Sequence, residues 1–246
     1  MTECSSVCRF RAAIASSAPA HDVCYACGAP AVSDDHAPAK VFFPAKKDLG
    51  DGAPDLRVNL LTVRSCAAHN GDASKDDEYV AFAIAQHFEN NKVALGQITT
   101  KIIRAFKRDP AKFGLVLNQA RPAVVHGGES VAFSADLPRM QRVFDRIGRA
   151  LYLKHFGRRY EGGVIRWMSP SMRMPDGKQH EGFVKLDQAL TQLVIEGKEP
   201  VVQGHIGHPS VFEYGIVGDA ERPFFRFKFY EGFVVLGASP KSVAAR

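Results

Sequence analysis

The fold is decided by the stretch that begins with Cys24-Tyr25-Ala26-Cys27-Gly28 and is completed about forty residues later by Cys66-Ala67-Ala68-His69. Two residues separate the potential ligands of each pair, which is the spacing of a zinc knuckle. A glycine directly after the second cysteine allows the backbone to turn there. Tetrahedral zinc takes four such ligands, so the two pairs predict one structural zinc site. The predicted ligands are Cys24, Cys27, Cys66 and His69.

The alternative interpretation of the first pair is a redox-active CxxC motif. Such a motif belongs at a strand–helix junction of a βαβ unit, whereas the sequence around Cys24 and Cys27 is typical of loops. The chain contains five cysteines, and the other two, Cys4 and Cys8, lie in a segment that we expect to be a poorly ordered tail. An odd cysteine count without a secretory signal argues against a disulfide framework and favours a reducing, cytoplasmic location.

Composition is typical of a water-soluble globular protein, and the charge is compatible with a polyanionic partner. The 246 residues include 46% hydrophobic and 24% charged residues, which is ordinary for a globular chain. Lys and Arg number 32 against 26 Asp and Glu, giving a formal charge of +6. This mild excess is compatible with nucleic acid but does not establish it. No apolar run approaches the ~20 residues of a membrane-spanning helix, so we expect no membrane partner.

The pattern of apolar residues divides the chain into four regions. We expect a tail over residues 1–20, a metal-organised core over 21–80, a helical region over 81–160 and a mainly β region over 161–246. Helical spacing is clearest in a run that closes near Gly157. Its apolar members are Met140, Val143, Phe144, Ile147 and Leu151.

The C-terminal region alternates with the period of a β-strand. Phe225, Phe227 and Phe229 are expected to face a core, with Arg226 and Lys228 facing outward. Turn-forming pairs at Gly218-Asp219 and Glu231-Gly232 separate the apolar runs. The sequence therefore predicts an α+β protein that ends in an antiparallel sheet.

Three further segments lie within or directly after the predicted zinc frame: SDDHAPAK at residues 33–40, VNLLTVRSCAAHN at 58–70 and SKDDEY at 74–79. In this order they resemble the HNH endonuclease family, whose ββα-metal core often sits inside a zinc-binding CxxC…CxxC frame. The resemblance covers roughly residues 22–80. It implies a treble-clef-like zinc-stapled core that hydrolyses DNA.

The resemblance also implies roles for individual residues. His36 resembles the general base that activates water, and Asn59 resembles the residue that orders the loop and orients that histidine. Asp35 and Asn70 resemble the ligands of one catalytic cation, Mg²⁺ or Mn²⁺. Cys24, Cys27, Cys66 and His69 resemble the ligands of the structural zinc.

These roles are chemically reasonable on general grounds. An imidazole with a pKa near 6.5 accepts a proton at neutral pH, and a carboxylate with an amide oxygen can hold a hard cation. Neighbouring side chains on a strand point to opposite faces, so Asp35 and His36 need a bulge or bend to reach one phosphate. Taken singly, each of these residues is more simply a surface polar group, a turn or a cap.

Basic residues at helical spacing provide candidate contacts to nucleic acid. Arg139, Arg142, Arg146 and Arg149 form one stripe, which we expect to be exposed beside the apolar stripe of the same helix. A second basic cluster comprises Lys101, Arg104, Lys107 and Arg108. The alternative is that these charges form solvated helix faces.

The sequence thus supports three hypotheses. The first is a metal-dependent HNH-type endonuclease. The second is a zinc-dependent module that binds nucleic acid or another partner without cleaving it. The third is a zinc-dependent scaffold whose C-terminal sheet carries the function.

Overall fold

The computed structural model describes residues 22–71, 73–108, 110, 121–125, 128–132, 134–174, 176, 178–196 and 201–240. The expected tail, residues 1–20, lies outside them, together with Cys4 and Cys8. The strands are β1 (Ser33–His36), β2 (Thr62–Ser65), β3 (Arg121–Val125), β4 (Gly128–Ala132), β5 (Arg166–Met168), β6 (Val201–His205), β7 (Phe212–Val217), β8 (Phe224–Phe229) and β9 (Phe233–Ala238). The helices are η1 (Lys40–Phe42), η2 (Lys46–Asp48), α1 (Ala67–Asn70), α2 (Ser74–Ala85), α3 (Lys92–Gln97), the π-helical η3 (Ile98–Ile102), α4 (Ile103–Arg108), α6 (Leu137–Phe156) and α7 (Glu181–Glu196).

An antiparallel sheet of five strands, in the order β5-β9-β8-β7-β6, forms the centre of the molecule. Strands β7, β8 and β9 form a meander in which Phe227 pairs with Tyr214 on one side and Val235 on the other. Phe225, Phe227 and Phe229 are fully buried while the residues between them are partly exposed. The predicted α+β class and the predicted C-terminal antiparallel sheet are confirmed.

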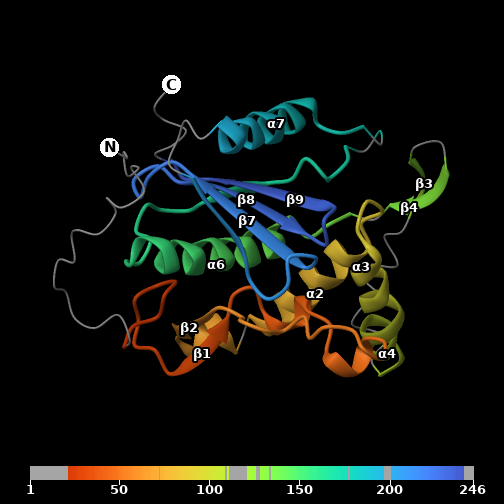
Figure 1. The fold of residues 1–246 in the computed structure, drawn as a ribbon, viewed down its shortest axis with the longest axis horizontal. Helices are drawn as coiled ribbons and strands as arrows, with labels where there is room; N and C mark the ends of the chain where they lie inside the picture. Colours follow the sequence, from red (N-terminus) through yellow and green to blue (C-terminus); the bar gives the residue numbers. More distant parts are fainter. Residues whose placement is uncertain are drawn as a thin grey trace, which may run out of the picture.

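Helices cover both faces of this sheet. Figure 1 shows α7 over one face and α6 under the other, with α2 and the hairpin of β1 and β2 beyond α6. Every residue of β9 is buried, as expected for a strand covered on both sides. The main core combines residues from α2, α6 and the sheet, so the first eighty residues pack onto the rest of the chain.

Helix α6 follows its sequence signals closely. Asp136 caps its start by accepting a hydrogen bond from the Arg139 backbone N–H, and Gly157 ends it with a positive φ of 68°. The five apolar residues predicted for its inner face are all buried. Among the helices that the structure describes, none combines the length and apolar character needed to cross a membrane.

The sequence did not predict two elements of secondary structure. Within the region expected to be helical, residues 81–160, β3 and β4 form a hairpin. Within the region expected to be mainly β, residues 161–246, α7 lies between β5 and β6. Leu186, Leu190 and Leu193 have helical spacing. They pack on the face of the sheet opposite α6, against Val217, Val234 and Leu236. A short apolar run between two strands is compatible with a helix or with a strand, and the sequence alone does not show which surface it packs against.

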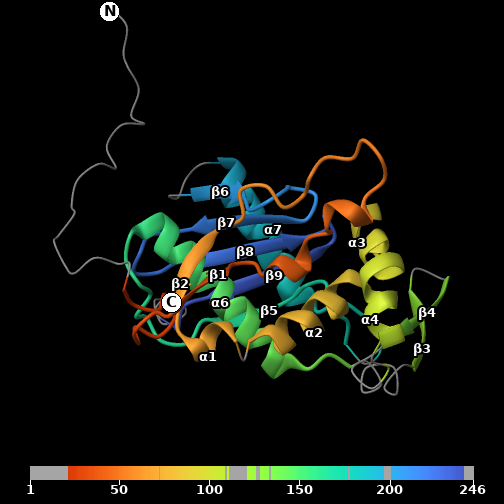
Figure 2. The same cartoon turned by 90° about the horizontal axis from the view of Figure 1, so that it is seen from below.

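The N-terminal unit is a hairpin followed by helices. Strand β1 pairs antiparallel with β2, with Asp35 opposite Val63 and His36 opposite Thr62. The chain then enters α1 and α2, which Figure 2 shows running away from the hairpin. The long connection from β1 to β2 carries η1 and η2.

Candidate metal centre and the polar site beside it

Four side chains converge at the base of the hairpin. The ligand atoms of Cys24, Cys27, Cys66 and His69 all lie within 4.8 Å of one another. Cys27 Sγ is 3.8 Å from Cys66 Sγ, and His69 Nδ1 is 3.7 Å from Cys24 Sγ and 3.2 Å from Cys66 Sγ. Zn–S bonds of about 2.3 Å place two sulfurs of a tetrahedral site about 3.8 Å apart. Three thiols and an imidazole at these distances could hold a metal such as zinc.

Backbone hydrogen bonds shape the first knuckle. Gly28 has a φ of 79° and its N–H donates to the Cys24 carbonyl at 2.9 Å. The Tyr25 N–H donates to the Arg64 carbonyl at 3.0 Å, which fixes this knuckle against β2. The positive φ at Gly28 is why a residue without a Cβ belongs there.

The second knuckle leads directly into α1. The N–H groups of His69 and Asn70 both donate to the Cys66 carbonyl, at 3.2 and 3.1 Å. This turn places the His69 ring beside the thiols. Burial, followed by the positive charges of Arg146 and Arg149, lowers the pKa of His69 and favours the neutral imidazole that metals bind.

The polarity around Cys24 favours its thiolate. Burial opposes ionisation, but the backbone N–H groups of Cys66, Cys27 and Ala26 outweigh it, so the pKa of Cys24 lies below the usual value. Thiolate is the form that binds metal. A fully buried thiol with three N–H groups directed at it therefore suits a ligand better than an inert core cysteine.

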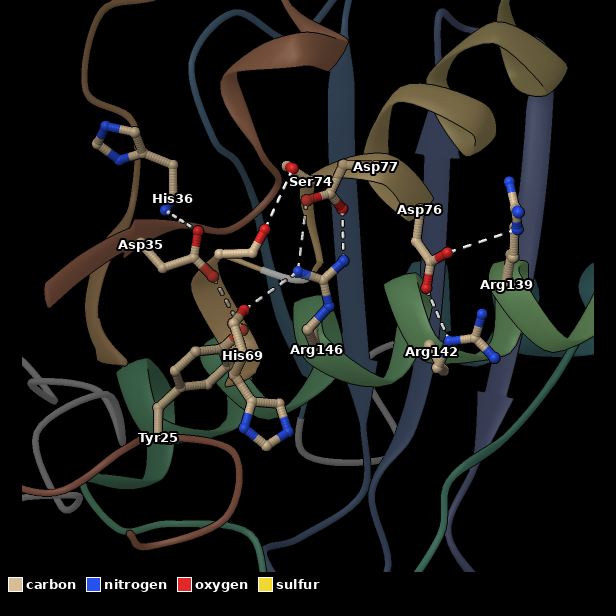
Figure 3. Close-up of polar contacts among 11 residues, drawn as sticks. Tyr25, Asp35, His36, His69, Ser74, Asp76, Asp77, Arg139, Arg142 and Arg146 are labelled. Atoms are coloured by element: carbon tan, nitrogen blue, oxygen red, sulfur yellow. Dashed lines mark hydrogen bonds and ion pairs between the residues drawn. The ribbon is translucent and has the colours of Figure 1, made fainter. Parts of the chain in front are cut away.

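Asp35 turns inward from β1. Its Oδ1 accepts from the His36 backbone N–H at 2.8 Å, and its Oδ2 accepts from the Tyr25 hydroxyl at 3.4 Å. Figure 3 shows the carboxylate directed toward Tyr25 and the neighbouring Arg146. Burial raises the pKa of Asp35, and the Arg146 guanidinium is the largest of the influences that lower it.

His36 points the other way. Its ring extends away from the Asp35 carboxylate (Figure 3), and its Nδ1 lies 3.1 Å from the Thr62 hydroxyl on the paired strand. Burial, followed by the Lys40 charge, lowers the pKa of His36 and favours the neutral ring. The strand is regular at this point, so the two neighbours lie on opposite faces, as the geometry of a strand requires.

Asn70 joins α1 to β1. Its Nδ2 donates to the Ser33 hydroxyl at 2.8 Å and to the Asp34 carbonyl at 3.1 Å. Both amide hydrogens are thereby engaged, which fixes the orientation of the side chain and presents Oδ1 as the atom able to bind a cation. The structure thus brings Asn70 to the strand that carries Asp35 and His36.

Asn59 belongs to neither β1 nor α1. It is exposed in the turn that precedes β2 and has a φ of 54°, a left-handed conformation that asparagine tolerates better than most residues. That placement accounts for the asparagine by turn geometry alone. Its role in ordering the loop and orienting His36 stays a prediction.

The expectation that the arginine stripe of α6 is exposed was wrong for Arg146. Its side chain is 11% exposed and forms a 2.6 Å ion pair with Asp77. Arg149 is also largely enclosed, with its Nε 2.6 Å from Asp145, while Arg139 and Arg142 are more open but share Asp76 as an ion-pair partner. Spacing on a helix does not reveal which carboxylates the tertiary fold brings to it. A role for these four arginines in contacting nucleic acid stays a prediction.

Several residues of the site were not found from the sequence. Arg146 bonds both the Asp77 carboxylate and, at 3.5 Å, the His69 carbonyl, so it links α6 to α2 and to the metal centre (Figure 3). Burial raises the pKa of Asp77 to about 6 against the opposing effect of Arg146. No local pattern marks a pair separated by 69 residues. Tyr25 contacts Asp35, and Thr62 contacts His36. Nothing in the sequence around Tyr25 or Thr62 indicated these contacts.

The chain was compared with known protein families, with curated proteins and with solved structures. None of them matched.

Proposed function

We propose that residues 21–80 form an HNH-type endonuclease core that hydrolyses phosphodiester bonds of DNA, with His36 as the general base. The observation that carries the proposal is the hydrogen bonding of Asn70 to β1. The bonds from its amide to Ser33 and Asp34 bring the asparagine of α1 to the strand that bears Asp35 and His36. The order of elements, a β-hairpin and then helices within one Cys/His frame, supports the same assignment.

In this proposal the Cys/His cluster has a structural role. All four ligands of a tetrahedral zinc come from the protein, which is typical of closed structural sites rather than catalytic ones. The zinc would fasten the first knuckle, the hairpin and α1 to one point. It would add to the packing of Phe42, Phe43 and Leu56 of the same segment in the main core.

His36 has the properties of a general base. Its ring is partly exposed, and Thr62 lies at hydrogen-bond distance from Nδ1. With Nδ1–H donating to the Thr62 hydroxyl, Nε2 would be the nitrogen free to accept a proton. Nε2 takes a proton from water while the water oxygen forms a bond to phosphorus. The bond between phosphorus and the leaving sugar oxygen breaks, and that oxygen leaves with a proton from solvent. General-base catalysis of this kind contributes about 10²- to 10⁴-fold to the rate.

A divalent cation fits the donor types of the remaining residues. The Asp35 carboxylate and the Asn70 amide oxygen are hard ligands of the kind that Mg²⁺ and Mn²⁺ prefer. The cation would offset negative charge on the phosphate when bound. Asp35 must turn away from Tyr25 to contribute, because its carboxylate now faces the interior.

Nicking of supercoiled plasmid tests the proposal. Purified protein with Mg²⁺ or Mn²⁺ is expected to nick, and His36→Ala is expected to lose the activity while retaining one zinc per chain. Thr62→Val is a matched variant that keeps the imidazole but removes its hydroxyl partner, and it should nick more slowly. Equal nicking by wild type and His36→Ala would rule out His36 as the base.

A second candidate is a zinc-dependent module that binds DNA without cleaving it. It is favoured by the opposite orientations of Asp35 and His36, and by the Arg146 cation beside Asp35. Under this alternative Asp35 and Arg146 form a structural ion network. Binding would then persist, nicking would be absent with every divalent ion, and Asp35→Asn would leave binding unchanged.

A further inference from the structure

Positive charge is concentrated in two segments that lie next to each other in space. Residues 40–57 and 98–108 together carry eight Lys and Arg residues against three Asp, and the second segment has no acidic residue. This excess nearly equals the formal charge of the whole chain, which is +6. We call these cations the basic face: Lys40, Lys46, Lys47, Arg57, Lys101, Arg104, Lys107 and Arg108.

Direct contacts hold the two segments together. The Lys101 ammonium donates to the Val41 carbonyl at 3.0 Å, and the Gln97 amide donates to the Phe42 carbonyl at 2.9 Å. Arg104 forms a 2.7 Å ion pair with Asp48. Figures 1 and 2 both show the loop that carries η1 and η2 beside α3 and α4.

Three cations of this face, Lys46, Arg57 and Lys101, donate to backbone carbonyl oxygens. Arg57 donates to the Phe43 carbonyl at 2.8 Å, as Lys101 does to Val41. A carbonyl orients a cation without neutralising it, so positive charge accumulates. Burial is the main cause that lowers the pKa of Lys101 to about 8, and the nearby Arg57 charge lowers it further. The residues of the face that are exposed are Lys40, Lys46, Lys47, Arg104, Lys107 and Arg108.

The basic face begins next to the proposed base. Lys40 follows His36 by four residues, and its charge is the largest influence on the pKa of His36 after burial. Each α6 arginine is paired with a carboxylate: Asp76 with Arg139 and Arg142, Asp77 with Arg146 and Asp145 with Arg149. On the basic face Arg104 is paired with Asp48, whereas Lys46, Arg57 and Lys101 donate to carbonyl oxygens that leave their charge in place. A phosphate chain would have to displace a carboxylate from each α6 arginine, whereas it would relieve repulsion among Lys46, Arg57 and Lys101.

We infer that the phosphate backbone of DNA lies across the basic face formed by residues 40–57 and 98–108, which leads it to His36. This inference rests on the proposed function and names the surface that the substrate uses. Each phosphate contact contributes about −0.9 to the slope of log affinity against log salt concentration. Binding should therefore be tight at low salt, steeply salt-dependent and insensitive to base sequence.

Fluorescence anisotropy with a labelled 20-base-pair DNA duplex, without added divalent cations, tests the surface independently of cleavage. The test variant is the triple charge reversal Lys47→Glu, Lys107→Glu and Arg108→Glu. The control is the triple variant Arg166→Glu, Lys178→Glu and Lys185→Glu. It reverses three exposed charges, which lie on β5, in the loop before α7 and on α7, respectively. We expect the test variant to lose at least about tenfold in affinity at 50 mM salt and to show a salt slope shallower by about 3.

Each outcome decides the inference. Loss of binding in the test variant with wild-type binding in the control supports it. Unchanged binding in the test variant, an equal loss in the control or no binding by wild type would overturn it. If the variants behave as expected but wild type nicks no plasmid with any divalent ion, the basic face stands and the proposed catalytic function fails.

Discussion

The Arg146 guanidinium lies 2.6 Å from the Asp77 carboxylate, and both side chains are about nine-tenths buried. Through a second bond to the His69 carbonyl, this pair connects the helix under the central sheet to the metal centre. Removing one partner leaves the other charge buried without compensation, which typically costs about 3–5 kcal/mol. We therefore expect Arg146→Leu to lower the free energy of unfolding by about that amount.

Urea unfolding monitored by circular dichroism measures this effect. Arg142→Leu is the matched control on the same helix, since its ion pair with Asp76 is more exposed and should contribute about 1 kcal/mol or less. The double variant Arg146→Leu/Asp77→Leu should recover part of the loss, because no unpaired charge remains. Equal losses of unfolding free energy in Arg146→Leu and Arg142→Leu would show that the buried pair contributes no more to stability than the exposed pair.

Removal of the metal should unfold the N-terminal unit. Structural zinc contributes about 10–16 kcal/mol of apparent binding free energy in small zinc-dependent domains. Cys66→Ser is expected to lower the zinc content well below one per chain and to lower the melting temperature. Elemental analysis and thermal melts check both, with Cys8→Ser as a thiol control outside the proposed ligand set. A full complement of zinc in Cys66→Ser would contradict the predicted site.

Lys101 should make stability depend on pH in the alkaline range. Its pKa is lowered to about 8 in the folded protein, against about 10.4 in an unfolded chain. Between these values the unfolded chain binds more protons, so stability rises with pH. From pH 8 to pH 10.5, the free energy of unfolding of wild type should therefore rise by about 1–2 kcal/mol relative to that of Lys101→Met. This value allows for screening by solvent. A constant difference over that range would contradict the lowered pKa.

Asn70 should matter for catalysis more than for the metal centre. Asn70→Ala removes two hydrogen bonds to β1 and the proposed cation ligand, while all four Cys/His ligands remain. We expect nicking to fall by at least about tenfold with zinc content unchanged. Ser33→Ala removes one of the same hydrogen bonds without the ligand oxygen and should have a smaller effect. Equal losses in the two variants would reduce Asn70 to a purely structural role.

The predictions from sequence succeeded where the determining signal was local. Spacing within CxxC and CxxH defines the Cys/His cluster, alternation defines the buried face of β8, and Gly157 marks the end of α6. The sequence did not predict α7 or the β3–β4 hairpin, because a short apolar run is compatible with either a helix or a strand.

The polar site was predicted only in part, for a related reason. Asp35, His36 and Asn70 were singled out by their order in the chain, and the structure places Asn70 against β1. The inward turn of Asp35 depends on Tyr25 and on Arg146, which comes from α6, more than a hundred residues away. The burial of Arg146 likewise depends on Asp77. Such contacts are consequences of tertiary packing and leave no local signal in the sequence.

The rate of plasmid nicking by His36→Ala relative to wild type is the decisive measurement of whether His36 acts as the base of a nuclease. Both proteins should carry one zinc per chain and bind the 20-base-pair duplex equally, so that any difference is one of catalysis. We expect a loss of about 10²- to 10⁴-fold for His36→Ala in the presence of Mg²⁺ or Mn²⁺. Equal rates, or a wild-type protein that binds DNA and never nicks it, would contradict that role.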